Sequence, residues 1–177
     1  MWVLKDPLAN KLSMEYIRNL IRNVPDFPKE GIAFKDITPV LADIKALRLA
    51  VKEMASPFED SGIDVIVGIE SRGFIFGAPI ADILNANFVP VRKPGKLPWK
   101  TERVEYELEY GTDSLEIHLD AIEKGQSVLI VDDLLATGGT AEATCKLVSK
   151  LGGNILGFTV LVELEFLEGR NRLNQYN

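Results

Sequence analysis

The chain has 177 residues, of which 46% are hydrophobic, and its formal net charge is -6. A negative net charge argues against nucleic-acid binding, because nucleic-acid-binding proteins usually present a basic surface to phosphates. The single cysteine, Cys145, excludes an internal disulfide, and neither a membrane-spanning stretch nor a secretory leader pattern is found. We therefore expect one compact domain over residues 1–177, in the cytoplasm, with no nucleic-acid or membrane partner.

Two helices are predicted in the first third of the chain. Apolar residues recur at helical spacing from Met14 to Val24, where Ser13 can cap the helix and Pro25 can end it. A second apolar face runs from Ile44 to Met54, directly after Asp43.

Strands and helices alternate in the rest of the chain. The predicted strands are Asp64–Ile69, Phe88–Val91, Val104–Tyr110, Ser127–Val131 and Asn154–Val162. The predicted helices are Phe74–Leu84 and a segment from Ala141 to Leu151, which Gly152 and Gly153 close. This order predicts an α/β fold, in which helices flank a mostly parallel, twisted sheet.

The most informative segment is Val128–Thr140, which reads VLIVDDLLATGGT. Its first four residues form the apolar run of a buried parallel strand, and Asp132 and Asp133 follow at the strand end, where α/β sheets bind ligands. The next residues place two glycines and two threonine hydroxyls before a helix, which suits a phosphate. A plain strand-to-helix turn would explain the glycines, but not the acids and hydroxyls beside them. The lysine of a P-loop is missing, which argues against a P-loop nucleotidase.

A basic segment follows the strand at Phe88–Val91. Residues 92–103 contain five cations and one acid, a local charge of +4 in an otherwise acidic chain. Such a loop suits a small polyanionic substrate.

The string VLIVDDLLATGGT resembles the phosphoribosyl pyrophosphate signature of the type I phosphoribosyltransferases. Four further segments resemble the adenine-specific branch of that family: FPKEGIAFKDITPVL at Phe27–Leu41, GIESRGFIFGAPIA at Gly68–Ala81, VRKPGKLP at Val91–Pro98 and YELEYG at Tyr106–Gly111. The resemblance implies transfer of a phosphoribosyl group from 5-phosphoribosyl 1-pyrophosphate to N9 of adenine, giving AMP and pyrophosphate. It also implies the fold of that family with a flexible hood loop, a Mg2+ cofactor and a homodimer.

The expected roles follow the parts of the substrate. Asp132 and Asp133 are expected to bond the ribose hydroxyls. The residues expected to bind the 5′-phosphate are Ala136, Thr137, Gly138, Gly139 and Thr140. Arg72, which follows a buried strand, suits stabilisation of departing pyrophosphate, whereas an ion pair with Glu70 is the alternative reading.

The basic segment supplies three further candidates for the diphosphate. Arg92 and Lys93 rank above Lys96, and each could instead be a solubilising charge. Mg2+ is expected to be held mainly by substrate oxygens and water, so no side chain is assigned to it.

The acid beside the base is expected on the alternating strand at Val104–Tyr110. Its glutamates, Glu105, Glu107 and Glu109, share one side, which is ordinarily a solvated face. Only the resemblance selects Glu109 as the catalytic carboxyl near adenine.

Base recognition is assigned by resemblance to Ala33, Phe34 and Lys35. Phe34 is a candidate for stacking, although an isolated phenylalanine is equally a core residue. Lys35 stands where many relatives carry arginine, so it lacks the planar fork of a guanidinium.

Two departures from the family are seen, in the segment after Arg170 and at Trp99, and neither is expected to touch the phosphate-binding residues. The alternatives left open are a phosphoribosyltransferase for another purine base, a non-catalytic regulator that senses phosphoribosyl pyrophosphate, and a catalytically idle subunit. A regulator would normally add a DNA-binding region, which the single helix before Pro25 cannot supply.

Overall fold

The computed structural model describes residues 7–107 and 112–176. It divides into two compact units, residues 1–53 and residues 54–177, and the single domain expected over 1–177 stays a prediction. Within the described part of the chain, no helix combines the length and hydrophobicity that crossing a bilayer requires.

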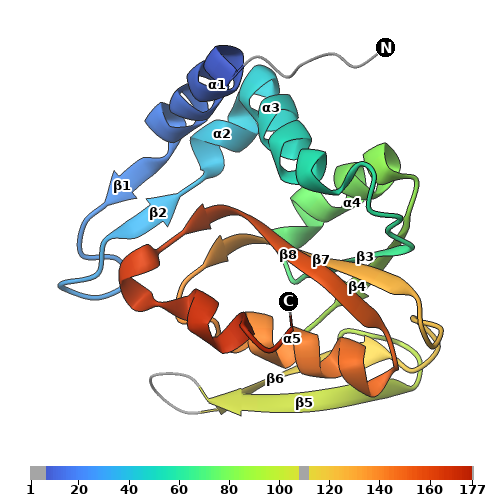
Figure 1. Ribbon diagram of the computed structural model, residues 1–177. Helices are drawn as coiled ribbons and strands as arrows, with labels where there is room; N and C mark the ends of the chain where they lie inside the picture. Colours follow the sequence, from blue (N-terminus) through green and yellow to red (C-terminus); the bar gives the residue numbers. More distant parts are fainter. Residues whose placement is uncertain (1–6, 108–111, 177) are drawn as a thin grey trace. The chain divides into compact units, whose positions relative to one another are not determined.

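The first unit contains three helices and a small antiparallel sheet (Figure 1). Its elements are α1 (Pro7–Leu20), β1 (Arg22–Val24), β2 (Phe34–Asp36), α2 (Thr38–Ala42) and α3 (Ile44–Ala55). The predicted helix after Asp43 is confirmed as α3. Asp43 caps it, because its Oδ1 accepts the amides of Lys45 at 2.8 Å and Ala46 at 3.0 Å.

The first predicted helix is wrong at both ends. α1 begins at Pro7, so Ser13 lies within the helix rather than at its start, and the helix ends at Leu20 rather than near Pro25. Residues 22–24 pair instead with residues 34–36 in register Arg22↔Asp36, where an ion pair of 3.2 Å joins the two side chains. The helical spacing of apolar residues continues into residues 22–24, but the backbone hydrogen bonds of this segment are made with residues 34–36 instead.

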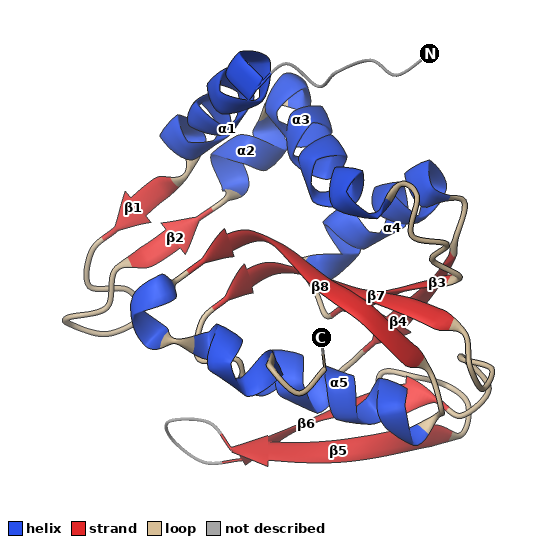
Figure 2. Cartoon of the chain, viewed as in Figure 1, coloured by secondary structure: helices blue, strands red, loops and turns tan. Residues whose placement is uncertain are grey.

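The second unit is built on a parallel sheet, as predicted (Figure 2). Its strands are β3 (Val65–Ile69), β4 (Asn87–Val91), β7 (Ser127–Leu135) and β8 (Asn154–Glu163), in the order β4-β3-β7-β8. The helices α4 (Gly73–Leu84) and α5 (Gly139–Lys150) cover opposite faces of this sheet. The predicted α/β fold is confirmed.

Alternate residues of the strands supply the two buried faces. Val67 and Ile130 pack in one cluster with Leu147 of α5, whereas Ile66 and Leu129 are buried on the other side. Both faces are thereby removed from water, which explains the unbroken apolar runs in the strand sequences.

The alternating segment does not join the parallel sheet, which corrects the prediction for Val104–Tyr110. It forms β5 (Thr101–Glu107), which pairs antiparallel with β6 (Thr112–His118) in a separate two-stranded sheet. Two strands joined by so short a link can only be antiparallel neighbours. The alternation itself is confirmed where it is described, since Val104 is buried and Glu105 is exposed.

Strand β7 is longer than predicted. It continues beyond Val131 to Leu135, because β8 extends beside it and pairs Leu134 with Val162 and Leu135 with Glu163. Asp132 and Asp133 therefore lie within the strand rather than after it.

The chain after β8 turns back in two short 3-10 helices. These are η2 (Glu165–Leu167) and η3 (Gly169–Leu173); a third, η1 (Ser56–Phe58), follows α3. Leu173 and Tyr176 pack against the core cluster on the α5 face.

Candidate functional site

A pocket of about 380 Å³ opens at the carboxyl ends of β3 and β7. It is lined by residues 70–72 of the β3–α4 link and by residues 132–141. The predicted site residues that it brings together are Arg72, Asp132, Asp133, Ala136, Thr137, Gly138, Gly139 and Thr140. The pocket is also lined by residues that sequence reasoning did not select, namely Glu70, Ser71, Leu134, Leu135 and Ala141.

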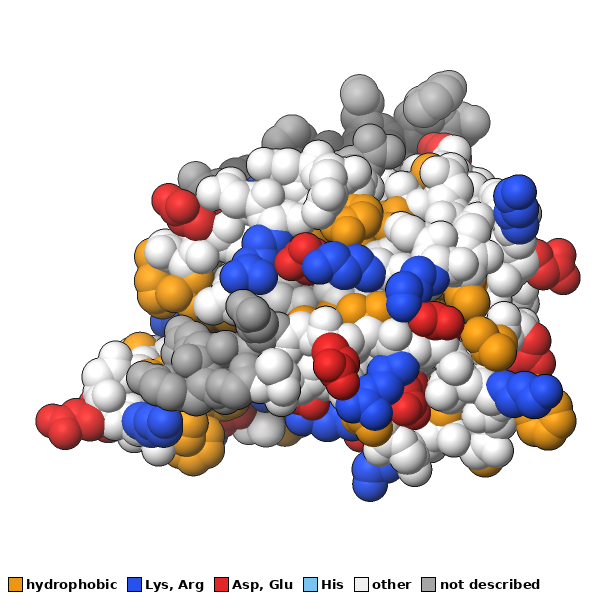
Figure 3. All heavy atoms as spheres, turned by 90° about the horizontal axis from the view of Figure 1, so that it is seen from below, with side chains coloured by type: hydrophobic (Ala, Val, Ile, Leu, Met, Phe, Trp, Pro, Cys, Tyr) orange, Lys and Arg blue, Asp and Glu red, His pale blue; other side chains and the backbone are white. Residues whose placement is uncertain are grey.

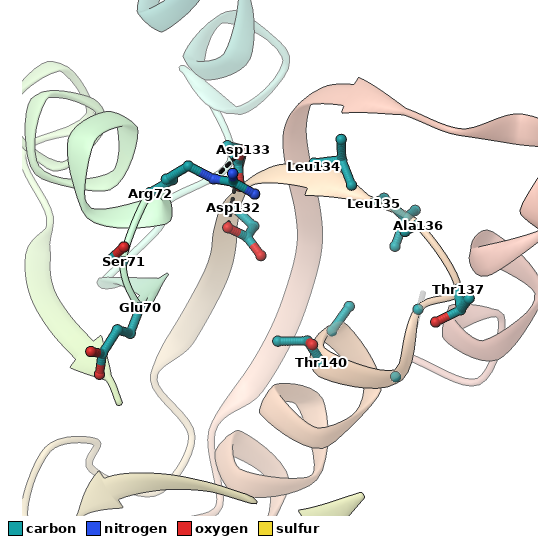
Figure 4. Close-up of a pocket in the computed structure, with 13 residues that line it drawn as sticks. Glu70, Ser71, Arg72, Asp132, Asp133, Leu134, Leu135, Ala136, Thr137 and Thr140 are labelled. Carbon is teal, nitrogen blue, oxygen red and sulfur yellow. Dashed lines mark hydrogen bonds and ion pairs between the residues drawn. The ribbon is translucent and has the colours of Figure 1, made fainter. Parts of the chain in front are cut away.

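Arg72 reaches from the start of α4 to the acidic end of β7 (Figure 4). Its Nε lies 2.7 Å from Oδ2 of Asp133, whose side chain is only 5% exposed. Gly73 makes this approach feasible, since a Cβ at that position would lie 2.6 Å from the carbonyl oxygen of Val131. The structure thus pairs Arg72 with Asp133, and Glu70 has another partner.

The surroundings of Asp132, the first of the two adjacent aspartates, disfavour its ionised form. Burial, and then the neighbouring charge of Asp133, raise the pKa of Asp132 well above its ordinary value, against a smaller opposing effect of Arg72. Its Oδ1 accepts the backbone amide of Asp133 at 2.8 Å. A partly exposed carboxyl that resists ionisation can exchange hydrogen bonds with a sugar hydroxyl as donor or as acceptor.

The loop after β7 ends at the amino terminus of α5. Gly138 has φ +83° and occupies the cap position, which favours glycine because L side chains are strained there. The amides of the first helical turn have no partners within a helix, and the positive end of the helix dipole lies at the same place. This terminus can bind a phosphate without a cationic side chain.

Thr140 connects this loop to the β5–β6 hairpin. Its hydroxyl donates to the hydroxyl of Tyr106 at 3.4 Å, and Tyr106 in turn donates to Asp113 Oδ2 at 3.4 Å. Nζ of Lys93 lies 3.0 Å from the same carboxylate oxygen, and this contact raises the pKa of Lys93. Sequence reasoning missed Tyr106 and Asp113, because only the register of β5 against β6 places them opposite each other.

The basic segment does not line the pocket but adjoins it through Glu70. Glu70 accepts from Nε of Arg92 at 3.1 Å and from the amide of Lys93 at 3.0 Å. Burial opposes ionisation of Glu70, but these two donors, with the charge of Lys96, leave its pKa below the usual value. Acidic and basic side chains also lie beside one another on the face of the molecule that Figure 3 shows.

The residues predicted for base recognition lie in the other unit, at and before β2. The ring of Phe34 makes an edge-on contact with Phe27, with 5.2 Å between ring centroids. Nζ of Lys35 donates to Asn23 at 3.3 Å, and Ala33 is exposed. Glu109 lies outside the described residues.

Comparison with known proteins gives one consistent answer. Residues 40–173 match the phosphoribosyl transferase domain. The adenine phosphoribosyltransferase of Acetivibrio thermocellus is 63% identical over 158 residues, which are 89% of this chain and 92% of that protein.

Solved structures agree with the sequence match. The adenine phosphoribosyltransferase of Thermoanaerobacter pseudethanolicus has a TM-score of 0.90 at 57% identity, covering 93% of this chain and 95% of that one. The Saccharomyces cerevisiae enzyme, in complex with D-2,5-dideoxy-2,5-imino-altritol 1,6-bisphosphate and adenine, has a TM-score of 0.88 at 41% identity, covering 93% and 96%.

Proposed function

This chain belongs to the adenine phosphoribosyltransferases of the phosphoribosyl transferase family. We propose that three groups of residues in its pocket each bind a different part of phosphoribosyl pyrophosphate. The enzyme transfers the phosphoribosyl group from phosphoribosyl pyrophosphate to adenine and forms AMP and pyrophosphate, a reaction of purine salvage. The observation that supports this assignment is that one pocket is lined by Arg72, by the aspartates of β7 and by the amino terminus of α5.

The sugar phosphate is held by the end of β7 and by the loop that follows it. Asp132 and Asp133 bond the ribose hydroxyls. Thr137, Thr140 and the backbone amides of residues 136–140 bind the 5′-phosphate, whose charge is favoured by the amino terminus of α5. The reacting carbon is thereby fixed between two anchored groups, which favours reaction by orientation.

Arg72 stabilises the departing pyrophosphate. Its side chain is 43% exposed, and the diphosphate offers oxygens that suit the planar fork of donors on the guanidinium. Arg92 and Lys93, and then Lys96, add charge as the neighbouring segment closes over the diphosphate and excludes water. For Arg92 and Lys93 this requires release of the contacts with Glu70 and Asp113.

Mg2+ fits this pocket as a cation bound mainly through substrate oxygens and water. Within the described residues, no group of three His, Cys, Asp or Glu side chains stands close enough together to enclose a metal. When bound, the ion offsets the negative charge of the diphosphate.

The remaining assignments rest on family membership. Glu109 acts beside the adenine ring, where a carboxyl can hold the base in the tautomer that presents N9 for attack. Ala33, Phe34 and Lys35 contact the base, with Phe34 stacking on the ring. The enzyme acts as a homodimer in the cytoplasm.

A base-specificity assay tests the acceptor. The purified protein is mixed with phosphoribosyl pyrophosphate, Mg2+ and one of adenine, hypoxanthine or xanthine, and the released pyrophosphate and the nucleotide are both quantified. We expect AMP with adenine and at most trace turnover with the other bases. Faster turnover of hypoxanthine or xanthine would overturn the acceptor assignment, and binding of phosphoribosyl pyrophosphate without turnover of any base would indicate a regulator.

A further inference from the structure

The short helix η3 lies directly against the loop proposed to bind the 5′-phosphate. A Cβ placed on Gly169 would lie 2.1 Å from the carbonyl oxygen of Ala136 and 3.0 Å from the nitrogen of Gly138. Conversely, a Cβ on Gly138 would lie 2.5 Å from the carbonyl oxygen of Gly169. The two backbones therefore touch with no room for a side chain.

This contact also determines which way one peptide group of the loop faces. The position of a Gly169 Cβ is 2.1 Å from the Ala136 oxygen but 3.1 Å from the carbon that carries it, so the carbonyl points at Gly169. In a trans peptide the N–H points opposite to the C=O. The amide of Thr137, a residue that lines the pocket, consequently faces away from η3.

The chain around Gly169 is held in place independently of the loop. Arg170 pairs with Glu163 at the end of β8, and Arg172 lies 3.3 Å from Glu142 in the first turn of α5. Leu173 and Tyr176 pack against the core cluster. A side chain at residue 169 would therefore displace the loop more readily than it would displace η3.

We propose that Gly169 is a positioning residue for the 5′-phosphate, which keeps the Ala136–Thr137 peptide turned so that its N–H reaches the ligand. The inference rests on the proposed role of residues 136–140 in phosphate binding. It adds a residue about thirty positions downstream of the phosphate-binding segment, with no side chain and no direct contact with substrate.

The test compares Gly169→Ala with Gly157→Ala. Gly157 on β8 is the control, because a Cβ there would also be too close to its neighbour, 2.6 Å from the ring of Phe58, in a contact made away from the loop. Both variants are expected to melt at a lower temperature. Only Gly169→Ala is expected to raise KM for phosphoribosyl pyrophosphate, and the dissociation constant of ribose 5-phosphate measured by calorimetry, by about tenfold or more, with KM for adenine within about twofold.

A second variant keeps the test informative if Gly169→Ala does not fold. Replacing both Arg170 and Arg172 by alanine loosens η3 without adding atoms, and it should raise the same two constants by about twofold to fivefold. The inference would be overturned if Gly169→Ala and Gly157→Ala changed ribose 5-phosphate binding equally. If Gly169→Ala does not fold, unchanged binding in the arginine variant would overturn it. A wild-type protein that binds no ribose 5-phosphate would instead contradict the proposed function.

Discussion

Asp132 shows how a catalytic protein tolerates an unfavourable charge. The carboxyl is largely removed from water and lies next to Asp133, so its ionised form is disfavoured and its pKa is raised. Arg72 lies 2.7 Å from Asp133 and offsets the unfavourable charge of Asp132 only in part. In the proposed ribose site this arrangement would suit substrate binding, because the sugar hydroxyls could replace the lost hydration.

Replacing Asp132 by asparagine should stabilise the fold and weaken substrate binding. The change removes a group whose ionised form the site disfavours, so we expect the free energy of unfolding to rise by roughly 1 kcal/mol. Phosphoribosyl pyrophosphate should bind at least about tenfold more weakly, because one ribose partner is altered. Urea unfolding and steady-state kinetics measure the two effects, and a destabilised Asp132→Asn would contradict the argument.

The same group predicts a pH dependence. Its folded-state pKa lies above the unfolded value, so between these two values the folded protein binds more protons. The contribution of Asp132 to the free energy of unfolding therefore falls as pH rises through that window. Asp132→Asn should remove this part of the slope, which urea unfolding between pH 4 and pH 8 would reveal as a difference between the two curves.

Glu109 can be tested against a glutamate of the same predicted strand face. If Glu109 acts as proposed, Glu109→Gln should lower kcat by about 100-fold, because the base would lose its carboxyl partner, with little change in melting temperature. Glu105→Gln is the control, since Glu105 is exposed and its partner is Arg103 at 3.2 Å. Equal kcat values for the two variants would remove the assignment of Glu109.

Cys145 is a structural thiol rather than a reactive one. It is buried among the core residues of α5, and this burial raises the pKa of its thiol to about 12. A thiol reagent should therefore label the native protein only at the rate at which the core opens. Labelling followed by absorbance with increasing urea checks this, and rapid labelling without denaturant would show that α5 is less well packed than described.

At the scale of elements, the β5–β6 hairpin and α5 meet through one pair of hydroxyls. Thr140 has a single hydroxyl proton, which it donates to Tyr106 at 3.4 Å. A bound phosphate would compete for this proton, so substrate binding at the loop and the hairpin contact oppose each other.

Tyr106→Phe should therefore leave phosphate binding intact or strengthen it. Because the competing acceptor is gone, we expect ribose 5-phosphate to bind up to about threefold more tightly, as calorimetry can show. Thr140→Val is the comparison, and it should bind the same ligand more weakly. Binding weakened in Tyr106→Phe as much as in Thr140→Val would mean that the tyrosine supports the loop rather than competing with the phosphate.

At the scale of the whole molecule, the structure predicts that metal removal affects catalysis and not folding. We expect Mg2+ to enter with the substrate, bound mainly by substrate oxygens and water, and among the described residues no three acidic, histidine or cysteine side chains are grouped as a metal site. Chelation with EDTA should abolish turnover, restored by added Mg2+, while the melting temperature of the substrate-free protein stays unchanged. A melting temperature lowered by EDTA would indicate a resident structural metal.

The sequence by itself determined much of this protein. Unbroken apolar runs predicted the parallel strands, and the string from Val128 to Thr140 predicted the paired acids, the loop and the helix after them, all of which line or adjoin one pocket. These features are local, since each depends on residues a few positions apart, and family resemblance added the reaction.

Contacts between distant residues were decided only by the tertiary structure. The separate β5–β6 sheet, the extension of β7 beside β8 and the choice of Asp133 over Glu70 as the partner of Arg72 each depend on segments that meet in space. So does the position of Gly169 against Ala136. A periodic pattern shows which face of an element is buried, but it carries no information about which other backbone or charge lies opposite, because that is settled when the whole core packs.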